Sequence, residues 1–169
     1  MVYIHHGGGE DHRGWVEQGR IGTIMDNLVA AGKATEAIVV SVNSNVPSAG
    51  RGGGGYSKES MAPYASELTE NIIPFIESTF RVKTGAANRA MCGLSMGGPE
   101  VFRNIGIFSA GIFGGITGAQ MDLEKEVPGM LSNTANFNKG LDVFYISCGE
   151  QDPRISYTKK YTDDMKKAG

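Results

Sequence analysis

The stretch Arg89–Gly98, with the sequence RAMCGLSMGG, decides the fold expected of this chain. A short apolar run leads into Gly-x-Ser-x-Gly, which is typical of a strand that turns sharply into a helix and lifts a serine above the sheet edge. Glycine is expected at Gly93 and Gly97 because Cβ atoms there would clash where strand and helix cross closely. Ser95 is therefore the candidate nucleophile.

The sequence around this pattern strengthens it. The Gly-x-Ser-x-Gly pattern alone is weak evidence, because it can occur by chance in a glycine-rich chain. This chain has 25 glycines in 169 residues, where average usage of about 7% predicts roughly 12. Val101, Phe102 and Ile105 follow at helix-like spacing. Pro99 falls early in the expected helix, where its missing N–H costs nothing. The alternative is an ordinary glycine-rich turn between a strand and a helix.

The composition predicts one domain over residues 1–169, with an apolar fraction of 40% that suffices for a core. The net charge is −2, with both signs interspersed, which argues against nucleic acid or an anionic membrane as partner. No apolar run reaches the 18 or more residues of a membrane span. Met1 leads directly into an apolar strand, which predicts no signal peptide and leaves the compartment open. Cys92 and Cys148 are expected to be reduced thiols at the ends of buried strands.

Apolar runs alternate with helical periodicity along the chain, which predicts the α/β class with a parallel sheet flanked by helices. The run at 37–42 is expected to be covered on both faces, and 143–147 to be buried. Pro74 is expected to kink the second helix. Residues 111–138 look mixed, with a short helix near Leu123. The expected strands are 2–4, 37–42, 90–92, 105–109 and 143–147, and the expected helices 21–29, 68–80 and 157–167.

Two glycine-rich loops follow expected strands. The residues of 50–55 form either a surface loop or a border of the site, and they lack the Gly-Lys-Ser/Thr ending of a phosphate loop. The loop His6-Gly7-Gly8-Gly9 follows the first strand. A loop without side chains lets main-chain N–H groups approach a developing negative charge. One oxyanion donor is expected from this loop and the other from the N–H of Met96, the residue after the serine.

An acidic partner is expected after a later strand. The turn Ser147–Pro153 contains Glu150 and Asp152. Asp152 is the candidate acid and Glu150 the alternative, while a turn or helix-capping aspartate before Pro153 is the structural interpretation. The three histidines, His5, His6 and His12, all precede Ser95. In this type of fold the order is serine, acid, histidine, so His5 and His6 are interpreted as loop structure near the site.

Three segments in this order resemble the esterase D-like branch of the α/β-hydrolases: the loop from His6 to Gly9, the Gly93–Gly98 turn and the segment Gly149–Asp152. Trp15 and the run Ile73–Glu77 look like the same group. The chain is most similar to carbohydrate esterase family 1, which includes feruloyl and acetylxylan esterases. The resemblance implies a Ser-Asp-His mechanism with Ser95 as nucleophile, Asp152 as acid and the N–H groups of Gly8 and Met96 as oxyanion donors.

The chain also departs from that family's pattern. Members usually have strands before the one that holds Tyr3, and a further strand and a histidine-bearing loop after a helix like 157–167. The segment between Ser95 and Ser109 also looks short. The expectation is an esterase core that lacks terminal strands and is incomplete at both ends.

Three hypotheses follow for the function. The first is an esterase whose catalytic histidine lies outside these residues, acting through an acyl-enzyme on Ser95 with no metal or organic cofactor. Its substrate would be a small ester or a feruloylated or acetylated oligosaccharide. The second is a catalytically inactive module that binds such a ligand, although a strained turn is costly to keep without a use. The third is a homo-oligomer in which a second copy pairs through exposed sheet edges. The compartment stays open, since members of the family are often secreted or periplasmic.

Overall fold

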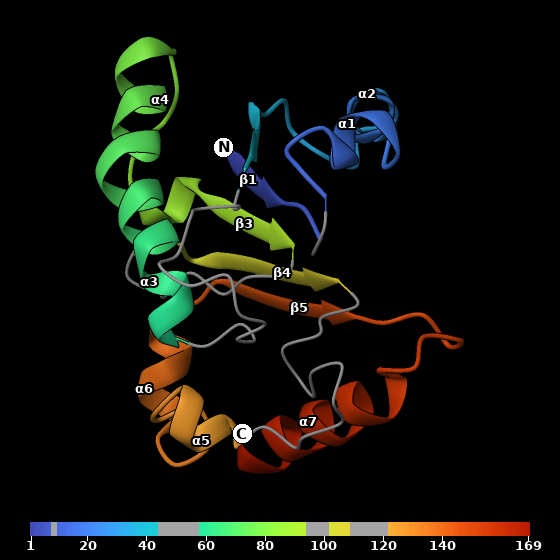
Figure 1. The fold of residues 1–169 in the computed structure, drawn as a ribbon, viewed down its shortest axis with the longest axis vertical. Coiled ribbons are helices and arrows are strands. Elements are labelled where there is room, and N and C mark those ends of the chain that lie inside the picture. The colour runs from blue at the N-terminus through green and yellow to red at the C-terminus, as the bar shows by residue number, and fades with distance from the viewer. Residues whose placement is uncertain (8–9, 44–57, 94–101, 109–121) are drawn as a thin grey trace.

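The computed structural model describes residues 1–7, 10–43, 58–93, 102–108 and 122–169 (Figure 1). In these ranges five strands form one sheet in the order β2-β1-β3-β4-β5, and every neighbouring pair is parallel. The predicted α/β class with a parallel sheet is therefore confirmed. The strands are β1 (Val2–His5), β2 (Val39–Val42), β3 (Ala90–Gly93), β4 (Asn104–Phe108) and β5 (Val143–Ser147).

Helices flank the sheet. In Figure 1 the column of α3 and α4 stands along one side of the strands, and α7 lies on the side of β5. The helices predicted at 21–29 and 157–167 are confirmed, whereas α6 has too few apolar residues to show a helical period. No helix in the described ranges has both the length and the apolar character to cross a membrane. The helices are α1 (Gly14–Glu17), α2 (Ile21–Ala30), α3 (Lys58–Ser66), α4 (Ile73–Thr79), α5 (Leu123–Glu126), α6 (Thr134–Lys139) and α7 (Ile155–Ala168), with a short 3₁₀ turn at Ala86–Asn88.

The irregularity expected at Pro74 takes the form of a wider helical turn. Between α3 and α4 the chain forms a π-helical segment, Glu67–Ile72, and the N–H of Ile73 donates to the carbonyl of Leu68, five residues earlier. Pro74 then stands in the first turn of α4. Because proline has no N–H to donate to the preceding turn, the regular i to i−4 pattern cannot continue through this position, and the wider π-helical turn lies directly before it.

The core lies between one face of the sheet and the α3–α4 column. Strand residues at alternate positions are buried on this face, and side chains of the helices cover them. Three aromatic or long side chains at its centre, Tyr3, Met91 and Phe102, are at most 1% exposed. The residues of this column that pack here are Tyr64, Leu68, Ile73 and Ile76, and Leu123 of α5 and Tyr161 of α7 belong to the same core.

Two predictions about the strands are wrong. Strand β5 was expected to be buried, yet Val143 is 51% and Tyr145 53% exposed on the opposite face. Strand β2 was expected to be covered on both faces, yet most of it is half-buried. Both are edge strands of the described sheet, and a continuous apolar run cannot reveal which strands have neighbours on both sides.

The strand predicted at 105–109 is confirmed as β4, whereas the assignment of Phe102 and Ile105 to a preceding helix is wrong. Ile105 belongs to β4, where it pairs with Met91, and buried Phe102 precedes that strand. Two or three apolar positions are too few to distinguish one turn of a helix from the start of a strand. Val101, Pro99 and Gly97 lie outside the described residues, as does the loop at 50–55. Both cysteines, which are described, are free thiols, as predicted.

Loss of one ion pair should loosen α4 from the sheet. Arg89, next to β3, donates from Nε and Nη2 to Oε1 of Glu77 at 2.8 and 2.6 Å, and the two side chains are 15% and 17% exposed. We expect Glu77→Gln to lower the free energy of unfolding by about 1–3 kcal/mol, the range for hydrogen bonds to charged groups. Urea unfolding at pH 7 measures this. Asp142→Asn, which breaks the more exposed pair with Arg103, is the control and should have a much smaller effect.

Candidate active site

The order of the strands locates the candidate site. From β1 the chain runs to one side to form β2 and then to the other side to form β3. In open parallel sheets, ligands bind beyond the carboxyl ends of the strands where the order reverses in this way. Here those ends are His5 of β1 and Gly93 of β3. Ser95 comes two residues after Gly93, and both Ser95 and Met96 lie outside the described residues.

Gly93 allows the two strand ends to meet. Its φ angle is +122°, which residues with a side chain rarely adopt, and a Cβ atom would lie 2.6 Å from the carbonyl oxygen and 2.7 Å from the Cβ of His5. The sequence predicted a glycine here because of a crossing helix. The neighbour that excludes a side chain is instead strand β1.

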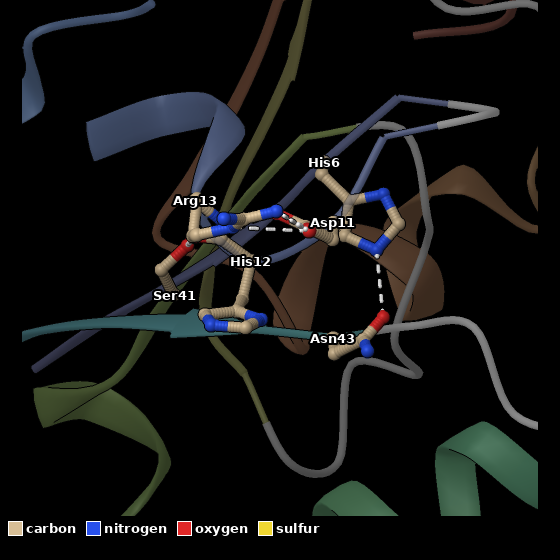
Figure 2. A network of polar contacts seen from close by, with 6 residues as sticks. All are labelled: His6, Asp11, His12, Arg13, Ser41 and Asn43. Atoms are coloured by element: carbon tan, nitrogen blue, oxygen red, sulfur yellow. Dashed lines mark hydrogen bonds and ion pairs between the residues drawn. The ribbon is translucent and has the colours of Figure 1, made fainter. Parts of the chain in front are cut away.

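The loop after β1 is fastened to the end of β2 (Figure 2). The imidazole of His6 is 4% exposed. Its Nε2 lies 3.2 Å from Oδ1 of Asn43, and its Nδ1 lies 2.8 Å from the carbonyl oxygen of Gly7. Further along, the hydroxyl of Ser41 donates to the carbonyl oxygen of His12 at 2.5 Å. These contacts hold the loop at both of its described ends.

A tight turn brings Gly7 and Glu10 together within this loop. The N–H of Gly7 donates to Oε2 of Glu10 at 2.9 Å, and the N–H of Glu10 donates to the carbonyl of Gly7 at 3.2 Å. The Gly7 N–H is therefore engaged and is not free to serve as an oxyanion donor. Gly8, the candidate donor, lies outside the described residues.

His5 is the most enclosed titratable group near the strand ends. It is 1% exposed, its Nε2 lies 2.8 Å from the hydroxyl of Tyr64, and its carbonyl accepts a hydrogen bond from Nε1 of Trp15. Burial, with a smaller effect from the neighbouring His6, lowers the pKa of the imidazole to about 4. The ring is therefore neutral at pH 7.

This burial predicts an acid-sensitive fold. Because the pKa of His5 is about 4 in the folded chain and 6.5 in its ordinary state, the unfolded chain binds the proton more readily between these values. The contribution of the neutral His5 to the free energy of unfolding is therefore complete above pH 6.5. It is lost as the pH falls towards 4. At about 1.4 kcal/mol per pH unit, the loss is about 3 kcal/mol. Urea unfolding from pH 7 to pH 4 measures it, and His5→Leu should flatten this part of the profile. An unchanged profile in that variant would contradict the assignment.

Asp152 lies in the turn between β5 and α7. Its Oδ1 accepts from the N–H of Arg154 at 2.8 Å, the Arg154 guanidinium lies 3.4 Å away, and its side chain is 14% exposed. Its main-chain carbonyl accepts from the N–H of Ile155, the first residue of α7. The carboxylate therefore organises the start of this helix, while Glu150 is exposed.

The described histidines belong to the far side of the candidate site from Asp152. His5 ends β1 and His6 follows it, whereas Asp152 follows β5, which is three strands away in the sheet. With about 4.8 Å between neighbouring strands, β1 and β5 lie about 14 Å apart in the sheet. His12 is exposed. Across the described ranges, no group of three or more His, Cys, Asp or Glu side chains is arranged to hold a metal ion.

Sequence reasoning missed the partners that hold this region together. Tyr64 and Asn43 are 59 and 37 residues from the histidines that they contact, and no sequence pattern pairs residues at such separations. The available signal was weaker: a tyrosine buried in a core usually finds a hydrogen-bond partner for its hydroxyl.

Comparisons with known proteins identify the family and the fold. A family model described as putative esterase matches residues 1–110. The chain is 37% identical over 179 aligned residues to a protein of Xylanibacter ruminicola named endo-1,4-beta-xylanase/feruloyl esterase. This alignment covers 100% of the chain and 22% of that relative, so the chain spans about a fifth of the relative's length.

Solved structures share the fold. A ferulic acid esterase superposes with a TM-score of 0.73 at 23% identity, over 99% of this chain and 72% of its own. The CE1 ferulic acid esterase of the anaerobic fungus Anaeromyces mucronatus superposes with TM-scores of 0.70 without substrate and 0.69 in complex with ferulic acid, at 22% identity. This chain covers 66% of that enzyme. The α/β-hydrolase-like fold is therefore confirmed.

Proposed function

We propose a function from one premise: this chain belongs to the putative esterase family. Its reaction is the hydrolysis of carboxylic esters, and its substrates are feruloyl or acetyl groups on plant polysaccharide or on oligosaccharides derived from it. The relative named endo-1,4-beta-xylanase/feruloyl esterase supports this substrate class. Full-length relatives extend well beyond the aligned region, so the activity of the whole protein is part of the proposal.

The observation that carries the proposal is the contact between Gly93 and His5 at the reversal of strand order. A left-handed glycine pressed against the neighbouring strand, two residues before a serine, fits a strained turn that presents a nucleophile. The end of an ordinary strand does not require a glycine with a positive φ angle. The fixed loop after β1 on the neighbouring strand supports an oxyanion site at the same edge.

The mechanism begins with attack of Ser95 Oγ on the carbonyl carbon of the ester, while a base takes the hydroxyl proton. The carbonyl oxygen becomes an oxyanion, which the N–H groups of Gly8 and Met96 stabilise. The tetrahedral intermediate then collapses, the alcohol leaves with a proton from the base, and an acyl-enzyme remains. Water attacks this ester in the same way and releases the acid. Asp152 orients the base, which is a histidine that these 169 residues do not include.

A second candidate is a catalytically inactive module that binds a carbohydrate or an ester. The observation that favours it is the position of Asp152, whose carboxylate accepts from the N–H of Arg154 at the start of α7 and which follows β5, three strands from the β1 strand that precedes His6. An aspartate in this position has a structural role even in a protein that lacks a catalytic base.

Hydrolysis of methyl ferulate and 4-nitrophenyl acetate by the full-length protein separates the two candidates. An enzyme turns over at least one of these esters, and a fluorophosphonate probe labels Ser95, as located by peptide mass spectrometry. A binding module retains feruloylated oligosaccharide without turnover or labelling. That second outcome would overturn the proposed reaction.

A further inference from the structure

The carboxyl end of β1 carries a buried polar pair that the proposed mechanism does not use. His5 is 1% and Tyr64 3% exposed. The hydroxyl of Tyr64 lies 2.8 Å from Nε2 of His5, and the two rings meet edge to face with centroids 4.8 Å apart. The residue paired with His5 on β2 is Val42. The pair therefore has a buried apolar neighbour on β2, since Val42 is 5% exposed.

Packing alone does not account for an imidazole at this position. Its other nitrogen, Nδ1, is buried and has no hydrogen-bond partner among the residues that the structure describes. A buried polar atom without a partner destabilises a fold, and an aliphatic side chain would fill this position without that cost. The hydrogen bond to Tyr64 is thus the feature that the histidine provides and an aliphatic residue cannot.

His5 contacts three elements near the carboxyl ends of β1 and β3. Its side chain reaches Tyr64 of α3, its carbonyl accepts from Trp15 of α1, and its main chain lies against Gly93 of β3. The loop after β1 begins at the following residues. A shift of His5 would therefore move the start of that loop and the end of β3 together.

We propose that His5 is a positioning residue, held by Tyr64, that fixes the two main-chain segments on either side of the candidate site. These are the loop after β1, which leads to Gly8, and the end of β3, which leads to Ser95. This inference rests on the proposed esterase function. Tyr64 is the anchor, because α3 packs on the core through this residue and brings its hydroxyl to the imidazole.

The test is a double-mutant cycle in the full-length protein with Tyr64→Phe, His5→Leu and the pair of both. Tyr64→Phe keeps the ring and removes only the hydroxyl. We expect each single change to lower kcat for methyl ferulate about five- to tenfold with KM within about twofold, as expected when geometry for the transition state is lost. Tyr145→Phe, on exposed β5, is the matched control and should leave kcat unchanged.

The double variant separates positioning from stability. Replacing both partners by apolar groups removes the buried polar atoms, so thermal stability should return to that of the parent or higher. We expect kcat to stay low in this stable protein. Parental kcat in the double variant, or in a folded Tyr64→Phe variant, would overturn the inference. Failure of Tyr64→Phe to fold would overturn it as well, since the hydrogen bond to His5 would then have a structural role. A parent without Ser95-dependent hydrolysis would instead overturn the proposed function, and this inference with it.

Discussion

Ser95→Ala is expected to lower kcat for methyl ferulate by about 10⁶-fold in the full-length protein, the loss typical when a serine hydrolase loses its nucleophile. Alanine has no hydroxyl, so no acyl-enzyme forms and water must attack the ester directly. The oxyanion donors and substrate binding remain, and together they leave about 10³–10⁴-fold catalysis over water. The fall should appear in kcat, while KM changes little.

The matched control is Ser156→Ala, which removes an exposed hydroxyl on α7 and should leave kcat and KM unchanged. Steady-state hydrolysis measures both variants, and a fluorophosphonate probe should label the parent and Ser156→Ala but not Ser95→Ala. Labelling of another serine together with retained turnover in Ser95→Ala would show that the nucleophile lies elsewhere.

Gly93→Ala is expected to lower the free energy of unfolding by about 3–5 kcal/mol, the largest effect on stability that we predict. Two costs combine. A φ of +122° strains any residue with a Cβ, and the added methyl group would lie 2.6 Å from the carbonyl oxygen of His5, so that β1 and β3 must separate. Because Ser95 follows within two residues, esterase activity should fall as well. Urea unfolding followed by circular dichroism measures the stability.

Two further glycines separate these costs. Gly32 has a φ of +66° with nothing within 4 Å of its Cβ position, so Gly32→Ala should cost only about 1–2 kcal/mol of strain. Gly22 lies within α2 in open space, and Gly22→Ala should raise the stability by about 0.5–1 kcal/mol. A Gly93→Ala variant no less stable than Gly32→Ala would show that the contact with His5 is not tight.

Much of the fold could be predicted because its strands are short apolar runs separated by turn and helix signals. Residues 2–4, 90–92 and 143–147 were all recognised, and the parallel order followed from their alternation with helices. The sequence could not show which strands lie at the sheet edges, since that depends on partners far away. Val143 and Tyr145 carry the apolar character of a core strand and are nevertheless exposed.

The candidate site could be predicted only in part. Gly93 was identified as a required glycine, and its φ and surroundings bear out the requirement although the neighbour is a strand. The roles of Ser95, Met96, Gly8 and Asp152 stay predictions. The contacts of His5 and His6 could not be foreseen, because a histidine in a loop sequence gives no sign of the tyrosine or asparagine that approaches from another element.

The position of β1 between β2 and β3 also affects how the chain folds during synthesis. Val2 pairs with Val39 on one side and with Ala90 on the other. At a ribosomal rate of about 5–20 residues per second, β2 follows β1 by roughly 2–7 s and β3 by roughly 4–18 s. During this interval one edge of β1 stays open, and its backbone groups are available to any other strand. The first described strand to leave the ribosome must therefore wait longest for its second neighbour.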